Sequence, residues 1–129
     1  MNINLELSIG EFFDKMTILE IKQERIPDPV KLENINTEHA YLVELLSQLP
    51  FSRTDVENEV AELKSVNEAL WVIEDDIREK ERNKIFDEGF IELARSVYVT
   101  NDRRSEIKRA INIKLGSDFV EEKSYEEYL

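Results

Sequence analysis

The sequence predicts an all-α fold, an antiparallel helical bundle of four to five helices with one long central helix. Three observations predict it. Apolar residues recur at steps of three and four along most of the chain, which is the period of an amphipathic helix. Only three glycines and three prolines occur, and 36 % of the residues are charged, which is typical of long solvated helices. The length of 129 residues predicts a single helical domain over 1–129, with an extended arm at 1–7 and an acidic C-terminal tail at 117–129.

The first helix is predicted from about Ile9 to Arg25. Apolar residues alternate over residues 1–7, which indicates a short extended arm or strand. Ser8 and Glu11 then form a capping box, in which Ser8 caps a first-turn amide and Glu11 reaches back. The helix stops before Pro27, because the residue before a proline is pushed out of helical dihedrals. The core stripe is Ile9, Phe12, Met16 and Leu19.

The second helix is predicted from Asp28 to about Leu49. Asp28 is the N-cap and Pro29 takes the first helical position. The short link makes this helix an antiparallel neighbour of the first. His39 lies in the apolar register, and we interpret it as a core or boundary histidine bonded to a neighbour, with a ligand role as the alternative. The apolar stripe is Leu32, Ile35, Leu42, Leu46 and Leu49.

The third helix is predicted to be the long one. It follows a capping box at Thr54–Glu57 and meets no breaker until about Phe86, so it is roughly 45–50 Å long. A helix of that length outruns its partners in a small domain, so we expect it to project or to dimerise. Its core stripe is Val56, Val60, Leu63, Leu70, Ile73 and Ile77, and a second stripe is Asn67, Trp71, Glu74, Arg78 and Glu81.

The last helical stretch, residues 89–116, carries a stripe that is apolar at both ends and polar in its middle. Either Asn101 caps a fifth helix or one helix continues to Leu115, and Gly116 is the expected C-cap. Burying the polar residues costs several kcal/mol unless they are paired. The stripe therefore either finds carboxylates nearby or lines a wet pocket or groove. Its members are Phe90, Ala94, Val97, Asn101, Arg104, Lys108, Ile111 and Leu115.

The same stretch is the one strongly basic run in an acidic chain. Between residues 89 and 117 it holds six basic and three acidic side chains, a net charge of +3 in a chain of −12. Arginine and lysine are suited to a carboxylate or phosphate. We expect the second stripe of the third helix to face this run across a groove. The predicted ligand-binding residues are Trp71, Glu74, Arg78, Arg95, Tyr98, Asn101, Arg104 and Lys108.

The alternative interpretation of the basic run is an internal salt-bridge network. Its partners would be the acidic residues of the third helix or the tail, because the chain has 29 carboxylates against 17 basic groups. Residues 117–129 have a net charge of −4 and carry apolar anchors, so we expect the tail to fold back, with the basic run as one surface that it could cover. The anchors are Phe119, Val120, Tyr125, Tyr128 and Leu129.

Composition excludes several classes of function. A net charge of −12 argues against nucleic acid and against an anionic membrane surface as partners. The chain has no cysteine and one histidine, so thiolate metal sites are excluded. No signal peptide and no membrane span are recognised, so we expect a cytoplasmic protein. Glu20, Glu24, Glu74 and Asp75 could hold Mg²⁺ between helices, but their spacing gives no clean ExxE…ExxD pattern. We therefore predict no metal and no cofactor.

Three runs resemble a family of small uncharacterised helical proteins of bacteria and phages, classed as a domain of unknown function. They are SIGEFFDKMTILEIKQERI at 8–26, LWVIEDDIREKE at 70–81, and FIELARSVYVTNDRRSEIKRAIN with the following EEKSYEEY at 90–128. The resemblance covers nearly the whole chain. It associates the chain with gene neighbourhoods for surface polysaccharide synthesis, which implies a sugar-nucleotide or phosphosugar ligand. It brings no catalytic residue.

Three hypotheses of function follow. The first is a binding or assembly module whose basic patch takes an anionic small molecule or an acidic partner segment. The second is an enzyme acting on a phosphorylated or carboxylated substrate, in which Arg104 and Lys108 hold the substrate and Glu74 is the acid or base. The third is a purely structural dimerisation protein, whose polar stripe is the seam. In each case we expect a homodimer.

Overall fold

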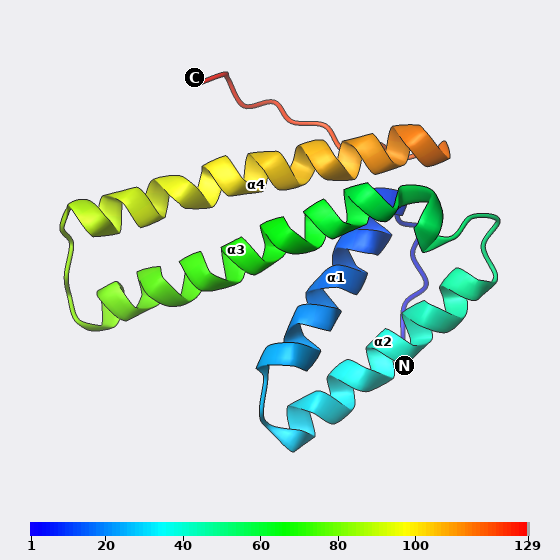
Figure 1. The fold of residues 1–129 in the computed structure, drawn as a ribbon, viewed down its shortest axis with the longest axis horizontal. Helices are drawn as coiled ribbons and strands as arrows, with labels where there is room; N and C mark the ends of the chain where they lie inside the picture. The colour runs from blue at the N-terminus through cyan, green and yellow to red at the C-terminus, as the bar shows by residue number, and fades with distance from the viewer. Residues whose placement is uncertain (129) are drawn as a thin grey trace.

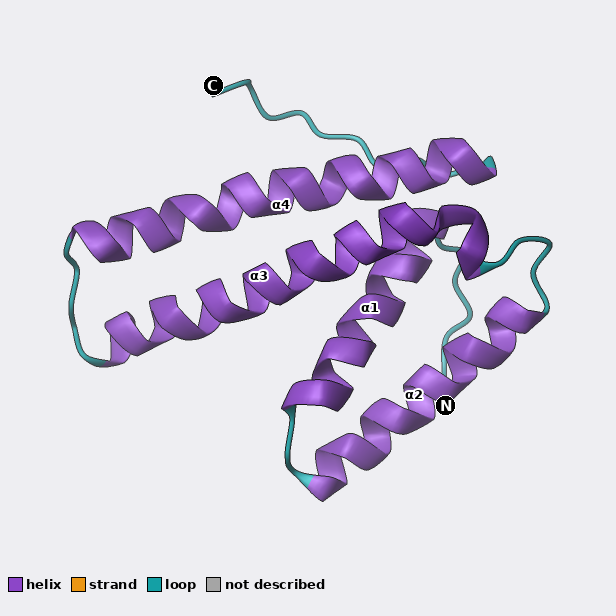
Figure 2. Ribbon diagram, viewed as in Figure 1, coloured by secondary structure: helices purple, strands orange, loops and turns teal. Residues whose placement is uncertain are grey.

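The computed structural model describes residues 1–128, and Leu129, one of the predicted tail anchors, lies outside the described residues. It confirms the all-helical prediction: no strand occurs within residues 1–128 (Figure 2). Residues 1–7 form an exposed, irregular arm. The elements are α1 (Ile9–Arg25), α2 (Pro29–Ser47), the short 3₁₀ turn η1 (Arg53–Val56), α3 (Glu57–Arg82) and α4 (Glu88–Leu115).

The helices form two antiparallel pairs, α1 with α2 and α3 with α4 (Figure 1). The α1 N-terminal half packs against both long helices, whereas α2 contacts chiefly α1. The chain after α4 turns back and runs along that helix. The hydrophobic core lies where α1 crosses α3 and α4. Its fully buried apolar side chains include Phe13, Met16, Val60, Leu63 and Ile111.

The start of α1 is fixed by its own cap and by the end of α4. A helix leaves its first four N–H groups without intrahelical partners. Here Glu11 N–H donates to Ser8 Oγ at 3.1 Å, as predicted. Gly10 N–H donates to Asn112 Oδ1 at 2.6 Å, and Ile9 N–H donates to Ser117 Oγ at 3.2 Å. Hydrogen bonds therefore join the N-terminal end of α1 to the C-terminal end of α4.

The Glu11 side chain does not complete the predicted capping box, because its carboxylate lies 2.6 Å from Lys108 Nζ instead. The box predicted at Thr54–Glu57 is displaced as well. There the Asp55 carboxylate accepts from Ser52 N–H at 2.8 Å, so this cap opens η1 and not α3. The first difference follows from the charge of the Lys108 ammonium, which is a stronger donor to a carboxylate than a backbone N–H.

Helix α4 runs unbroken through Asn101, so the single-helix alternative is the one observed. Asp87 caps its start by accepting from Phe90 N–H at 3.0 Å. Gly116 ends it in the left-handed region at φ 70°, where glycine is favoured, as predicted. Helix α3 ends at Arg82, before the predicted Phe86, so α3 and α4 are both long.

The α3–α4 hairpin extends beyond α1 and α2 (Figure 1). We call residues 68–106, its far part, the hairpin arm. No residue of the arm is fully buried, because two helices alone cannot enclose an apolar stripe. Trp71, Ile73 and Val97 are half-buried, and Val72 and Ile91 are exposed.

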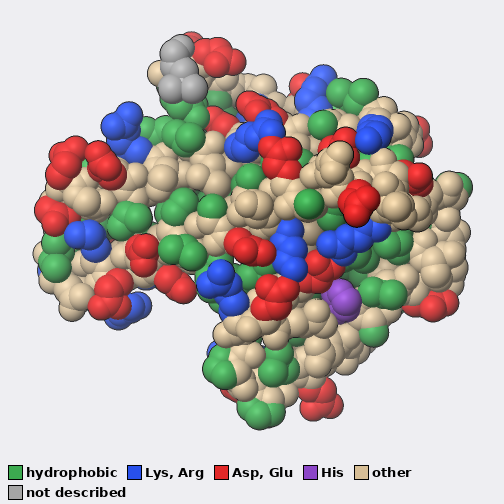
Figure 3. All heavy atoms as spheres, viewed as in Figure 1, with side chains coloured by type: hydrophobic (Ala, Val, Ile, Leu, Met, Phe, Trp, Pro, Cys, Tyr) green, Lys and Arg blue, Asp and Glu red, His purple; other side chains and the backbone are tan. Residues whose placement is uncertain are grey.

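Charged side chains of both signs are interspersed on the face drawn in Figure 3. The basic run is therefore not a surface patch of one sign on this face. Within residues 1–128, no helix combines the length and the apolar character that a membrane crossing requires.

Candidate functional site: a pocket between α4 and the C-terminal tail

The polar residues in the middle of the α4 stripe face α1, where Arg104 forms an ion pair with Asp14. Arg104 Nε donates to Asp14 Oδ1 at 2.8 Å, and a second guanidinium nitrogen donates to Oδ2. Asp14 is only 1 % exposed, and Asn67 Nδ2 also donates to it, at 2.9 Å. The hydrogen bond with Asp14 raises the pKa of Arg104 and outweighs the opposite effect of burial. The pair is thus a fixed, desolvated part of the fold.

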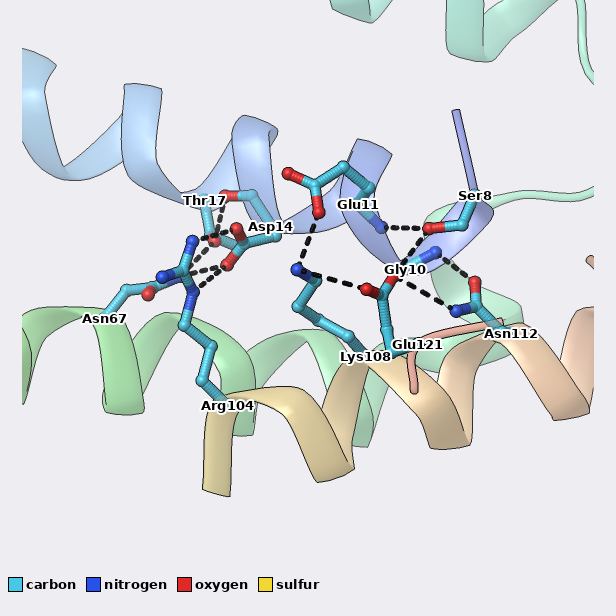
Figure 4. A network of polar contacts seen from close by, with 10 residues as sticks. All are labelled: Ser8, Gly10, Glu11, Asp14, Thr17, Asn67, Arg104, Lys108, Asn112 and Glu121. Carbon is cyan, nitrogen blue, oxygen red and sulfur yellow. Dashed lines mark hydrogen bonds and ion pairs between the residues drawn. The ribbon is translucent and has the colours of Figure 1, made fainter. Parts of the chain in front are cut away.

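Lys108 lies one turn further along and joins α1 to the tail (Figure 4). The residue is only 8 % exposed. Its ammonium lies 2.6 Å from Glu11 Oε2 and 3.7 Å from Glu121 Oε2. The Glu121 carboxylate also accepts from Ser8 Oγ at 2.8 Å and from Asn112 Nδ2 at 3.5 Å. The Glu121 carboxylate of the tail is therefore held by Ser8, just before α1, and by Lys108 and Asn112 of α4.

Three of the four remaining basic groups of the run, all except Arg95, form ion pairs at the surface. Their partners come from α3, from α4 itself and from the tail. The pairs are Arg103 with Glu62 and Glu106, Arg109 with Glu122, and Lys114 with Glu59. The predicted internal network therefore exists, with α3 and the tail as predicted partners. The two partners on α1, Asp14 and Glu11, were not predicted.

The tail and α4 enclose a pocket of about 620 Å³, which we call the tail pocket. Tyr98 and Tyr128 both line it and pack edge to face, with ring centroids 5.3 Å apart. The Tyr128 hydroxyl donates to Asp102, which raises the pKa of Tyr128 to about 12. Lys123 also pairs with Asp102. The lining residues are Val97, Tyr98, Asn101, Asp102, Arg104, Ser105, Lys108, Lys123, Tyr125 and Tyr128.

A second pocket of about 480 Å³, which we call the arm pocket, is lined by α1, α3 and α4. Of the predicted site residues it brings together five: Trp71, Glu74, Arg78, Asn101 and Arg104. Asn101 and Arg104 line both pockets. The predicted set is thus divided between two pockets, and the expected groove between the α3 and α4 stripes contains Arg104 but not Lys108.

Arg95 lines neither pocket. It bonds to the Tyr98 hydroxyl, which raises the pKa of Arg95. Glu74, the predicted acid or base, forms an ion pair with Arg78 and has a side chain that is 42 % exposed. The two pockets bring together charged side chains and aromatic rings.

Three of the four carboxylates considered for a metal, those of Glu20, Glu24 and Glu74, pair with cations. Arg53 and Lys64 hold Glu20, and Lys64 also lies 2.6 Å from Glu24. Burial raises the pKa of Glu20, but the bonds from Arg53 and the nearby charges leave it below its usual value. His39 Nε2 lies 3.9 Å from the same carboxylate. Residues 1–128 contain no group of three metal-ligating side chains.

Comparison with known proteins places the chain in a family. A family model described as a family of unknown function, DUF6165, matches residues 3–129, so the chain belongs to that family. Comparisons with curated proteins and with solved structures find no match.

Proposed function

We propose that this member of the DUF6165 family is a binding module for an anionic small molecule, and that the tail pocket is its binding site. The observation that carries the proposal is the charge of the lining. Three cationic residues line it, Arg104, Lys108 and Lys123, with one carboxylate, that of Asp102, whereas the carboxylates that pair with Arg104 and Lys108 lie outside the lining. A half-enclosed cationic pocket in an acidic protein selects anions, because the surrounding carboxylates repel them elsewhere.

The size and the aromatic lining support a ligand with more than a charged group. A volume of about 620 Å³ lies within the range of small-molecule sites. Tyr98, Tyr125 and Tyr128 offer ring faces and hydroxyls, which suit a sugar or a base attached to the anionic group. A nucleotide, a sugar nucleotide or an aromatic carboxylate meets both requirements.

Within this pocket, Lys108 is the residue that we expect to hold the anion. Arg104 is committed to Asp14 through two hydrogen bonds, whereas Lys108 keeps one of its carboxylate partners at 3.7 Å. A charge-assisted hydrogen bond contributes about 1.5–3 kcal/mol. Its loss weakens binding by roughly 10- to 100-fold.

The test is a thermal-shift screen of the full chain with inorganic phosphate, dicarboxylates, nucleotides and sugar nucleotides. A ligand at 100 times its Kd stabilises by about 2.7 kcal/mol, which raises the Tm by several degrees in a domain of this size. Any hit is then titrated against Lys108→Gln and against Lys114→Gln. The control removes the same charge from the same helix, at a lysine that pairs with Glu59 and lines neither pocket.

We expect Lys108→Gln to weaken binding at least tenfold and Lys114→Gln to leave it within about twofold. Equal losses in the two variants would mean general attraction to basic residues and no specific site. A screen without any hit would reject the proposal.

We also propose that the chain forms a homodimer through the hairpin arm. The support is the exposed apolar surface of the arm, which includes Val72, Ile91 and Val99 at 44 %, 48 % and 45 % exposure. Two such hairpins packed together would make a four-helix bundle and cover these side chains. Sedimentation equilibrium of the full chain tests this, because a mass of two protomers supports the dimer and a mass of one contradicts it.

A further inference from the structure

We infer that the carboxylate of Glu121 is an internal competitor for the anion site, so that a ligand binds by displacing the tail from Lys108. This inference rests on the proposed function. It specifies which group the ligand replaces, and it makes the C-terminal tail a regulator of access to the pocket.

The charges around Arg104 and Lys108 require that an incoming anion replace a carboxylate that is already bound there. Two cations, Arg104 and Lys108, already face three carboxylates from Glu11, Asp14 and Glu121. A ligand that added its own negative charge would place four anionic groups around two cations. Like charges in a partly buried site repel strongly, because solvent screens them poorly. One carboxylate must therefore leave when the ligand enters.

Glu121 is the carboxylate that can leave. Asp14 is buried and bonded by Arg104 and Asn67. Glu11 belongs to α1 and lies 2.6 Å from Lys108 Nζ. Glu121 lies farther from that ammonium, at 3.7 Å, and belongs to a tail without secondary structure.

The donors that hold Glu121 are a preformed oxyanion socket. Ser8 and Asn112 are 7 % and 0 % exposed, so both are buried before any ligand arrives. With Lys108 they present a hydroxyl, an amide and an ammonium to the Glu121 carboxylate. A ligand carboxylate or phosphate can accept from the same three donors.

The rest of the tail is held by contacts that exchange easily. Arg109 pairs with Glu122, and these side chains are 46 % and 76 % exposed. Lys123 and Tyr128 both bond to Asp102. Exposed ion pairs contribute little, so these contacts can adjust when the Glu121 carboxylate moves, while Tyr128 stays packed on Tyr98.

The experiment titrates inorganic phosphate and succinate, by calorimetry, into the full chain and into two variants. Glu121→Gln removes the competing charge, and Glu126→Gln removes the same charge from an exposed residue of the same tail. We expect at least one probe to bind Glu121→Gln about tenfold more tightly than it binds the wild type, and Glu126→Gln to match the wild type. The two probes distinguish a phosphate ligand from a carboxylate ligand.

The outcomes separate this inference from the proposed function. Equal affinities of the wild type and Glu121→Gln, or weaker binding to the variant, overturn the competition but leave an anion site. Absence of binding to all three proteins overturns the competition, whereas the proposed function is then decided by the wider screen of nucleotides and sugar nucleotides. Binding to Glu121→Gln alone supports both, because it means that the wild-type tail outcompetes the probe.

Discussion

Arg104 and Lys108 occupy equivalent positions on α4 but have different roles. Arg104 neutralises Asp14, which is 1 % exposed. Lys108 lines the tail pocket and lies between a helix carboxylate and a tail carboxylate. The first residue is part of the fold, whereas the second is the one that we propose to bind a ligand. The sequence pattern does not distinguish the two roles, because both residues lie on the same face of the helix.

The different role of Arg104 predicts a large effect on stability. In Arg104→Ala, Asp14 remains buried without its cation, and breaking a buried pair in this way costs about 3–5 kcal/mol. The guanidinium is 28 % exposed, so we expect the lower end, about 3 kcal/mol. The neighbouring variant Arg103→Ala breaks only exposed pairs with Glu62 and Glu106 and should cost less than about 1 kcal/mol.

Urea unfolding of the two variants measures this difference. Similar unfolding free energies for Arg104→Ala and Arg103→Ala would show that the Asp14 pair is not a structural element.

The sequence predicts the polar stripe of α4 but not its main partner. Asn101, Arg104 and Lys108 stand out because they interrupt an apolar pattern. Asp14 gives a weaker signal, because it lies beside the apolar stripe of α1 and not within it. A second stripe on α1 could have found it: Gly10, Asp14, Thr17 and Ile21 follow steps of four, three and four and are all buried.

Among the elements, the crossing of α1 and α4 is the closest contact that the sequence could not predict. A Cβ atom on Gly10 would lie 2.9 Å from the Lys108 carbonyl carbon and nearer still to its oxygen. The glycine therefore lets two backbones meet, which brings the Asn112 side chain to the Gly10 N–H. Nothing local in the sequence distinguishes this glycine from an ordinary first-turn residue.

We predict that Gly10→Ala separates α1 from α4 and destabilises the protein by about 1–3 kcal/mol, the range for overpacking. Gly89→Ala is the matched control. Its Cβ would meet the end of the flexible Lys80 side chain at 3.1 Å, and alanine favours a helix over glycine. Thermal unfolding compares the two variants. A Gly10→Ala protein as stable as Gly89→Ala would contradict the close crossing.

The helix boundaries were predicted well wherever a cap marks them. Ser8, Asp28 and Gly116 fix three ends at the predicted residues. The α3 boundaries were predicted less well, because Asp55 caps the preceding 3₁₀ turn and no proline marks the far end. Helix α4 stays continuous because the chain has no glycine or proline between Phe90 and Leu115, and asparagine alone does not break a helix.

At the scale of the whole molecule, the arrangement of the tail determines where the tail pocket lies. The acidic tail was predicted to fold back, and it runs along α4 (Figure 1). The position of the tail depends on contacts between residues far apart in the chain, such as Ser8 with Glu121. Such contacts depend on how the helices cross, which periodicity along one chain does not encode. The division of the predicted site into two pockets has the same origin.

The most direct test of the tail pocket as the binding site is amide NMR of the full chain during titration with the tightest probe from the screen. We expect the largest shifts on residues 97–108 of α4 and 123–128 of the tail, which line the tail pocket. If the largest shifts fall instead on residues 67–78 of α3, which line the arm pocket, or are spread without a centre, the tail pocket is not the site.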